Sequence, residues 1–313
     1  MEQVEERYIS LLTDFGFKRI FGSAPNKDLL ICFLNSLFNG KQVVKDVSYL
    51  NPEHVGDVYT DRRAIFDVYC EGENGEKFIV EMQNAYQTYF KDRSLFYSTF
   101  PIREQAPKGD DWDFKLNHVY TVALLNFSMN DDAFDKEKIR HHVQLCDTAT
   151  HKVFYDKLEF IYVEIAKFDK KLDELQTLYE KWLYVLKNLY KLSQRPKELC
   201  DKVFDRLFEE AEIAKFSPLE MREYEASKKA YRDIKNSVDT AKREGIAEGI
   251  EKGMKQGMEK GMEKNMKQGM EKGLEQRSLE IARKMQAKGM DAASVMEITG
   301  LSAEQMQQLK AEF

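Results

Sequence analysis

Two short runs of alternating apolar and polar residues, separated by a turn, constrain the fold of this chain more than any other feature. The first run ends near Cys70, the second begins near Phe78, and the sequence ENG occupies positions 73–75 between them. Alternation with a period of two is typical of strands that bury one face, and Gly75 accepts the positive φ that a three-residue loop requires. The segment 64–83 is therefore predicted to form a β-hairpin.

The length of this loop also predicts how the two strands pair. It places Val68 opposite Val80 on an apolar face, and Asp67 opposite Glu81 on the other face, with Gln83 two residues further along. Opposed carboxylates repel each other and require a compensating cation, and oxygen ligands suit Mg²⁺ or Mn²⁺. The hairpin therefore predicts a metal site, and an exposed acidic strand face is the alternative.

The segments on either side of the hairpin predict an α/β fold with a mixed sheet flanked by helices. The apolar run HVYTVALLNF at 118–127 indicates a strand that is buried on both faces in the middle of the sheet. One helix is expected to begin directly after Gln83. Helices are predicted in the segments 10–22, 28–38 and 84–105. Further strands are predicted in the segments 43–50, 142–145 and 158–165. This core is expected to end near Phe168.

From Lys170 onward the strand signals disappear, and the sequence predicts a helical extension over residues 169–241. Charged residues make up 33% of the chain and are concentrated in its C-terminal part, which favours solvated helices there. Breaks are expected near Pro196 and Pro218. The predicted helices span residues 172–192, 197–215 and 218–242.

Residues 245–274 form a repeat with a period of four, in which glycine is followed by Ile, Met or Leu and Asn265 replaces one glycine. Seven glycines would cost an isolated helix roughly 7 kcal/mol. A period above 3.6 favours right-handed winding of closely packed partner helices. The helix over 242–277 is therefore expected to mediate homo-oligomerisation, and a solvated linker is the alternative. The repeated glycines are Gly245, Gly249, Gly253, Gly257, Gly261, Gly269 and Gly273.

The last segment, 278–313, is predicted to be a small unit of three helices. Gly289 and Gly300 separate the helices, and Asp291 and Ser302 are placed to cap the second and third. This order resembles a helix-turn-helix unit. Packing against protein and reading of DNA are both open roles, and the scarcity of basic residues after position 288 favours the first.

Composition excludes several other classes of protein. Hydrophobic residues at 42% and aromatic residues at 12% support a real core, whereas a net charge of −6 argues against a broad basic surface, so any contact with DNA is expected to be local. The four scattered cysteines predict neither a zinc site nor a disulfide framework. The first ten residues lack the pattern of a signal peptide, and no run approaches the ~18 apolar residues of a membrane span. A cytoplasmic protein without a membrane segment is expected.

Several segments, taken in order, resemble the PD-(D/E)XK nuclease superfamily, in particular its recombination-promoting nuclease/transposase family. They are TDFGFKRIFG at 13–22, FDVYC at 66–70, IVEMQ at 79–83 and the predicted helix that carries Arg93 and Tyr97. The resemblance extends weakly to FIYVEIAKF at 160–168 and to the glycine repeat. It implies a restriction-endonuclease-like fold, with residues 1–168 as the nuclease core.

The resemblance also implies roles for three residues of the hairpin. Asp67 and Glu81 correspond to the metal-binding acids of the superfamily. Gln83 stands where the superfamily motif usually has lysine, although glutamine is frequent there in this branch. A glutamine can hydrogen-bond to a water molecule or a phosphate, but it carries no charge and cannot act as a general base.

Three residues outside the hairpin are further candidates for the site. Lys18 could supply the charge that Gln83 lacks, Asp14 could add a carboxylate at the metal, and Arg93 could contact a phosphate. A surface charge is the alternative for Lys18 and Asp14, and an ion pair with Asp92 or contact with solvent is the alternative for Arg93.

Two functions from different classes follow from these observations. The first is a Mg²⁺- or Mn²⁺-dependent DNA endonuclease that hydrolyses phosphodiester bonds in a recombination or mobile-element setting. The second is a catalytically weak or inactive relative that acts as an oligomeric interaction protein through its helical C-terminal region.

Overall fold

A computed structural model describes residues 6–51, 53–54, 64–106, 112–129 and 131–311 of the chain. The chain forms two compact units, Met1–Val238 and Asp239–Phe313.

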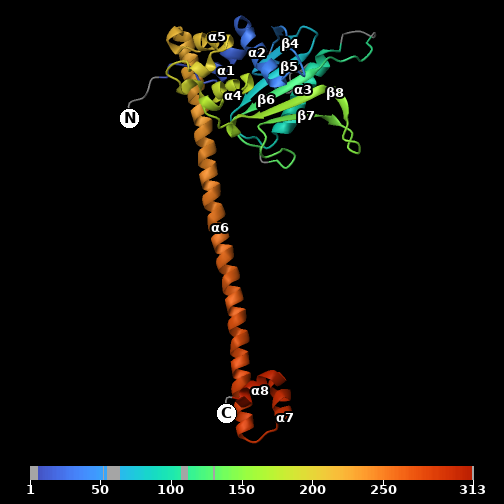
Figure 1. The fold of residues 1–313 in the computed structure, drawn as a ribbon, viewed down its shortest axis with the longest axis vertical. Helices are drawn as coiled ribbons and strands as arrows, with labels where there is room; N and C mark the ends of the chain where they lie inside the picture. Colours follow the sequence, from blue (N-terminus) through green and yellow to red (C-terminus); the bar gives the residue numbers. More distant parts are fainter. Residues whose placement is uncertain (1–5, 52, 55–63, 107–111, 130, 312–313) are drawn as a thin grey trace. The chain divides into compact units, whose positions relative to one another are not determined.

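A mixed sheet of six strands, counted over the described residues, forms the centre of the first unit (Figure 1). Neighbouring strands pair in an antiparallel manner except for β5, β6 and β8, which run parallel to one another. In spatial order the strands are β1 (Val47–Tyr49), β4 (Val68–Gly72), β5 (Lys77–Gln83), β6 (Val119–Leu125), β8 (Val153–Glu164) and β7 (Arg140–Cys146). A separate antiparallel pair consists of β2 (Glu53–His54) and β3 (Ala64–Ile65).

Helices cover both faces of the sheet. One face shares the main hydrophobic core with α1 (Asp14–Phe21), α2 (Lys27–Phe38), α4 (Leu178–Asn188) and α5 (Lys202–Glu210), and Figure 1 shows these four helices gathered beside the strands. The other face packs against α3 (Phe90–Glu104). Short 3-10 helices connect these elements: η1 (Ala24–Asn26), η2 (Ile165–Lys167), η3 (Leu172–Glu174), η4 (Leu189–Lys191), η5 (Lys197–Leu199) and η6 (Ile213–Lys215). This arrangement confirms the predicted α/β class.

The predicted hairpin is confirmed in its turn and in its register over Val68–Glu71, whereas the ladder stops short of the predicted pair of Asp67 and Glu81. Gly75 adopts a φ of +83°, which glycine tolerates because it has no Cβ. Val68 pairs with Val80, and the apolar side chains of this face lie in the main core. The alternate residues of the two strands therefore face α3, as the alternation required.

The strand that leads into the hairpin is less continuous than the pattern predicted. Residues 66–67 separate β3 from β4, and Asp67 lies in a bend. At this point the Asp67 carboxylate, through Oδ2, accepts a hydrogen bond from the backbone N–H of Met82 at 2.8 Å. A side chain thus satisfies a buried donor of β5, which backbone pairing would satisfy in a continuous strand.

The central strand was also predicted correctly. All seven residues of β6 are buried, and β6 lies between β5 and β8 with parallel pairing on both sides. A strand buried on both faces cannot alternate with polar residues, which explains the continuous apolar run in the sequence.

The prediction that a helix begins directly after Gln83 was wrong, because α3 begins at Phe90. The side-chain amide of Asn84 donates to the carbonyl of Leu12 at 2.7 Å, and the amide of Gln83 donates to the carbonyl of Ala85 at 2.9 Å. These contacts hold the intervening residues in a loop. The helices of the C-terminal half also differ in extent, since α4 and α5 are shorter than predicted and are flanked by 3-10 turns.

A single helix, α6 (Pro218–Ala287), contains both the last helix predicted for the extension and the whole glycine repeat. Two short helices follow it, α7 (Ala292–Thr299) and α8 (Ala303–Ala311), and pack with the end of α6 around a small core. The predicted caps are present. Asp291 accepts hydrogen bonds from the N–H groups of residues 293 and 294, and Ser302 exchanges hydrogen bonds with Gln305.

Candidate active site

Glu81 faces α3, and Asp67 lies in the bend before β4, close enough to Glu81 for its charge to be felt there and 3.9 Å from Lys18 on α1. Glu81 lies in β5 and is only 7% exposed. Its Oε2 lies 3.1 Å from Nη2 of Arg93. Its Oε1 is buried and has no hydrogen-bond partner among the described residues. Burial, which the charge of Arg93 opposes and the charge of Asp67 assists, raises the pKa of Glu81 to about 7.

Asp67 is held at the start of β4 by its hydrogen bond to the backbone of Met82. Burial raises the pKa of Asp67, and the Met82 N–H and the charge of Lys18 act in the opposite direction. Both carboxylates are therefore difficult to ionise together without an additional positive charge. This agrees with the sequence argument that two opposed acids need a cation.

Arg93 is the cation that contacts Glu81 in the structure. From the first turns of α3, its Nη2 donates to the side-chain oxygen of Gln83 at 2.8 Å as well as to Glu81, and its Nη1 donates to Oε1 of Gln87 at 2.7 Å. Its guanidinium carbon lies 5.4 Å from the ring centroid of Tyr97, a cation–π distance. The sequence had suggested Asp92 or solvent as the alternative partner of Arg93 and did not identify Gln87. An amide six residues before an arginine carries no signal until the loop that joins them is known.

Lys18 and Asp14 both lie on α1, next to the acid pair. Lys18 Nζ contacts Asp14 Oδ1 at 2.7 Å and lies 3.9 Å from Oδ1 of Asp67. The helix begins there because Thr13 accepts a hydrogen bond from the N–H of Gly16 as its N-cap. The structure thus brings together Asp67, Glu81, Gln83, Arg93 and Lys18. Among the described residues, Asp14 contacts this group through Lys18, and its side chain is largely exposed.

The donor atoms fit a hard divalent cation in part. No group of three His, Cys, Asp or Glu side chains that could hold a metal ion is found among the residues that the structure describes. The site instead offers two carboxylates and the amide oxygen of Gln83, and oxygen donors of this kind are the ligands of Mg²⁺ and Mn²⁺. Among the described residues, Oε1 of Glu81 and Nε of Arg93 are both buried at this site without a hydrogen-bond partner, and a bound cation would satisfy the carboxylate oxygen.

A basic hollow lies on the same face of the sheet, beside α3. Its volume is ≈ 750 Å³, and its lining includes Lys91, Lys138 and Arg140. Lys138 makes an ion pair with Asp135 at 3.4 Å, and Lys91 pairs with Asp131. Tyr162, on β8, lines the hollow. It is in register with Glu81 on β5, and β6 lies between these two strands. The hollow is therefore close to the acid pair.

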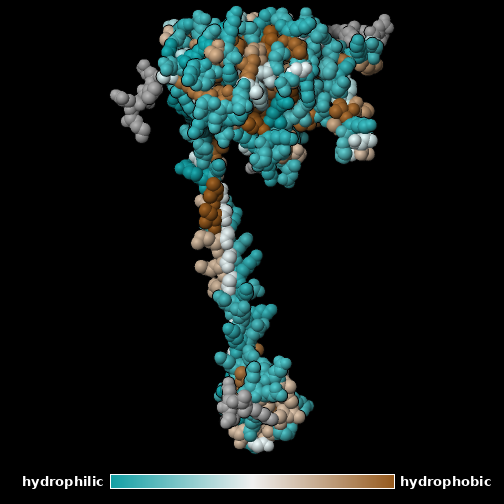
Figure 2. Space-filling view, in the orientation of Figure 1, coloured by the Kyte–Doolittle hydropathy of each residue, from teal (hydrophilic) through white to brown (hydrophobic). Residues whose placement is uncertain are grey.

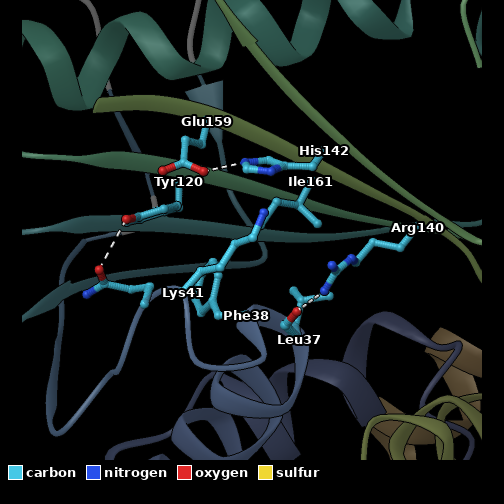
Figure 3. A pocket seen from close by; sticks show the side chains of 9 residues that line it. Leu37, Phe38, Lys41, Tyr120, Arg140, His142, Glu159 and Ile161 are labelled. Carbon is cyan, nitrogen blue, oxygen red and sulfur yellow. Dashed lines mark hydrogen bonds and ion pairs between the residues drawn. The ribbon is translucent and has the colours of Figure 1, made fainter. Parts of the chain in front are cut away.

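A second, smaller pocket lies on the opposite face of the sheet, towards α2 (Figure 3). His142 and Glu159 contact each other across it, and Tyr120 hydrogen-bonds to Gln42 at 3.3 Å. The sheet separates these groups from Asp67 and Glu81. His141 lies on the face of the basic hollow instead, where its Nε2 is 3.0 Å from Oε2 of Glu164.

Comparison with known families identifies the chain. The profile of the family described as PD-(D/E)XK nuclease family transposase matches residues 11–241, more than two thirds of the sequence. The chain belongs to this family. A second profile, described as Rpn/YhgA-like nuclease family, C-terminal HTH domain, matches residues 275–311. Comparisons with curated proteins and with solved structures found no match.

Membership of the PD-(D/E)XK nuclease family transposases confirms the resemblance inferred from the hairpin and its flanking motifs. It agrees with the mixed sheet and the flanking helices, which are consistent with a restriction-endonuclease-like fold. The match to the C-terminal profile covers α7, α8 and the end of α6, where the sequence had suggested a helix-turn-helix-like unit. Within the described ranges, no helix combines the length and the apolar character of a membrane span.

Proposed function

We propose that this chain is a metal-dependent DNA endonuclease that hydrolyses phosphodiester bonds in recombination or transposition. The observation that carries the proposal is the acid pair of Asp67 and Glu81, in which a buried carboxylate oxygen has no partner among the described residues. Membership of the nuclease family supports the reaction class.

Asp67, Glu81 and the amide oxygen of Gln83 would hold Mg²⁺ or Mn²⁺, and Asp14 is the candidate for a further carboxylate. When bound, such an ion lowers the pKa of a water molecule and polarises a phosphate oxygen. The residues of the chain prepare the site for it. Glu81 must lose its proton, and the burial that raises its pKa makes this loss depend on a nearby positive charge.

Arg93 is proposed to exchange one partner for another. In the structure its guanidinium compensates Glu81. Its other partners, Gln83 and Gln87, are neutral amides, so the contact with Glu81 supplies the charge compensation. A bound cation that compensated Glu81 would leave Arg93 able to contact a phosphate, for which its planar donors are suited.

In the usual motif of the superfamily a single lysine provides both a hydrogen-bond donor and a positive charge. Here Gln83 would provide the hydrogen bond and Lys18 the charge. The amide of Gln83 can orient a water molecule by hydrogen bonding but cannot accept its proton. Lys18 lies 3.9 Å from Asp67 on a half-exposed side chain and would supply positive charge at the entrance of the site. The basic hollow lined by Lys91 and Lys138 would accept the neighbouring phosphates of the DNA backbone.

Nicking of supercoiled DNA in Mg²⁺ or Mn²⁺ tests this function. We expect Asp67→Ala to reduce the nicking rate at least about 100-fold, because loss of one charge-stabilising group at a reacting centre has effects of this size. Glu71→Gln is the matched control, since Glu71 lies in the same hairpin but pairs with Lys77 at 2.7 Å, outside the site. Equal nicking by wild type and Asp67→Ala, or no cleavage in either metal, would remove the assignment.

A second candidate function is favoured by the pairing of Gln83 with Arg93, which leaves the usual lysine position without a charge. In this case the chain is a catalytically weak relative that acts as an oligomeric interaction protein through its helical C-terminal region. Metal binding measured by calorimetry on the intact chain separates the two. Binding that Asp67→Ala abolishes supports the nuclease, and its absence in wild type supports the second function.

A further inference from the structure

Two exposed tyrosines lie in the loop of residues 84–89, which leads from Gln83 of the acid site to α3. Hydrophilic residues cover most of the visible surface of the first unit (Figure 2). Among the tyrosines in the described ranges, Tyr86 and Tyr89 alone are exposed, at 55% and 75%. Apolar side chains scattered singly over a surface are normal, whereas a pair of aromatic rings beside a site indicates a surface that meets a ligand.

The loop that carries these rings is fixed to the acid site. The side-chain oxygen of Gln87 accepts a hydrogen bond from Nη1 of Arg93 at 2.7 Å. Nη2 of the same arginine contacts Glu81 at 3.1 Å and the side-chain oxygen of Gln83 at 2.8 Å. Gln87 lies between the two tyrosines in the sequence. Arg93 therefore holds the segment that carries both rings next to the acids.

The ring of Tyr86 is held in place although it is exposed. Its centroid lies 5.6 Å from that of Phe127, at an interplanar angle of 89°. Phe127 follows β6, at the edge of the sheet where the carboxyl ends of the parallel strands β5, β6 and β8 meet. Ligands of open α/β sheets bind at this edge. A ring that packing already fixes loses little freedom when a ligand covers it, which favours binding.

Cations accompany the two rings and indicate the class of ligand. Arg93 contacts Glu81, and Lys91, two residues after Tyr89, lines the basic hollow. Aromatic rings interleaved with cations are typical of sites for single-stranded nucleic acid, in which phosphates contact the cations and bases stack on the rings. A duplex cannot use such rings, because its bases stack on one another and present only their edges in the grooves.

We propose that Tyr86 and Tyr89 stack on unpaired bases, and that the substrate of the acid site is DNA with a single-stranded stretch at the bond to be cleaved. The inference rests on the proposed nuclease function, because it takes DNA as the ligand of that site. Each ring covers the face of one base, and the phosphates of the same strand contact Arg93 and Lys91. A fully paired duplex must first open, which has an unfavourable free energy that an unpaired stretch avoids.

Binding of DNA to the intact chain without metal is the first test, since no cleavage then takes place. The probe is a short single strand of thymidines with one 2-aminopurine, whose fluorescence falls when its base stacks on an aromatic ring. We expect this fall, and binding at least about tenfold tighter than that of the same sequence in a duplex. Unchanged fluorescence at saturation, or equal affinity for both forms, overturns the proposal. Tighter binding of the same sequence as RNA overturns the choice of DNA.

Substitutions at the rings test the stacking itself. Tyr86→Leu with Tyr89→Leu keeps apolar side chains without rings, and should raise Kd for the single strand at least about tenfold and abolish the fall in fluorescence. Tyr86→Phe with Tyr89→Phe keeps the rings and should bind as wild type does. Phe154→Leu is the matched control, because Phe154 is 81% exposed at the start of β8, away from the carboxyl edge. An equal loss in the phenylalanine pair or in the control contradicts stacking at this loop.

Cleavage provides a second test. In Mg²⁺ or Mn²⁺, a duplex that contains a loop of unpaired thymidines should be cut at the loop at least about tenfold faster than a fully paired duplex of the same length. Equal rates overturn the inference and leave the nuclease function standing. If neither DNA is cut, the nuclease function fails, and binding of the metal-free chain to the single-stranded probe still decides whether the rings stack on bases.

Discussion

The hairpin site and the ridge of α6, formed by the apolar side chains at every fourth residue from Ile246 to Leu274, both violate the usual distribution of polar and apolar groups, in opposite directions. Glu81 buries a carboxylate to 7% exposure, whereas Met254 exposes 72% of an apolar side chain to solvent. Burying a charge and exposing an apolar band both cost stability. Each region therefore indicates a partner of the corresponding character, a cation for the buried acids and an apolar helix surface for the ridge.

The largest effect on stability is expected at Glu81. Its pKa is about 7 in the folded chain, against 4.5 when unperturbed, so the folded state binds more protons between these values. The contribution of Glu81 to stability is fully present below pH 4.5 and is lost as the pH rises through 7. Glu81→Gln removes this loss, and the variant should gain up to about 3 kcal/mol over wild type between pH 4.5 and pH 8.

Urea unfolding of the metal-free chain at pH 5 and pH 8 measures this difference. Glu71→Gln, in the same hairpin, is the control and should show no comparable pH-dependent gain. If Glu81→Gln gains no stability relative to wild type at the higher pH, burial of the ionised carboxylate does not lower the free energy of unfolding. The contrast between Glu81 and the exposed side chains of α6 would then not hold. A gain in stability together with loss of nicking would mark a residue retained for function.

Sequence reasoning succeeded where local chemistry determines the structure. The alternation around Gly75 was sufficient for the hairpin register, and the apolar run of β6 for its central place in the sheet. Both depend on short-range periodicity and on burial, which a single sequence displays.

The failures arose where distant segments meet. The start of α3 depends on the contact between Asn84 and the carbonyl of Leu12, which are 72 residues apart. Arg93 was identified as a site residue, but its pairing with Glu81 and Gln83 requires the path of the intervening loop. Contacts between distant segments leave no periodic pattern in the sequence. The candidate residues of the site could therefore be named from the sequence, but the residues that each of them contacts could not.

Polar substitutions on the ridge of α6 test whether its exposed apolar side chains contact a partner helix. Replacing Met258 and Met262 by glutamine should weaken self-association by about 2 kcal/mol, roughly 30-fold in Kd, because burial of one methionine contributes about 1.5–3 kcal/mol. Analytical ultracentrifugation over a range of concentrations measures the change. Glu259→Gln with Glu263→Gln, outside the ridge, is the control and should change Kd much less. An equal effect of both pairs of substitutions would place the contact elsewhere on α6.

The smallest effect is expected at the basic hollow, where charge is neither buried nor unpaired. Lys138→Ala removes one cation that already pairs with Asp135, so DNA binding should weaken by only about 1 kcal/mol and the slope of log affinity against log salt should fall by about 1. Lys170→Ala is the control, because Lys170 pairs with Glu180 outside the hollow. Fluorescence anisotropy with a DNA duplex at several salt concentrations distinguishes the two. Identical slopes for both variants would remove the hollow from the DNA path, and the specific role of charge would then be confined to the buried pair at Asp67 and Glu81.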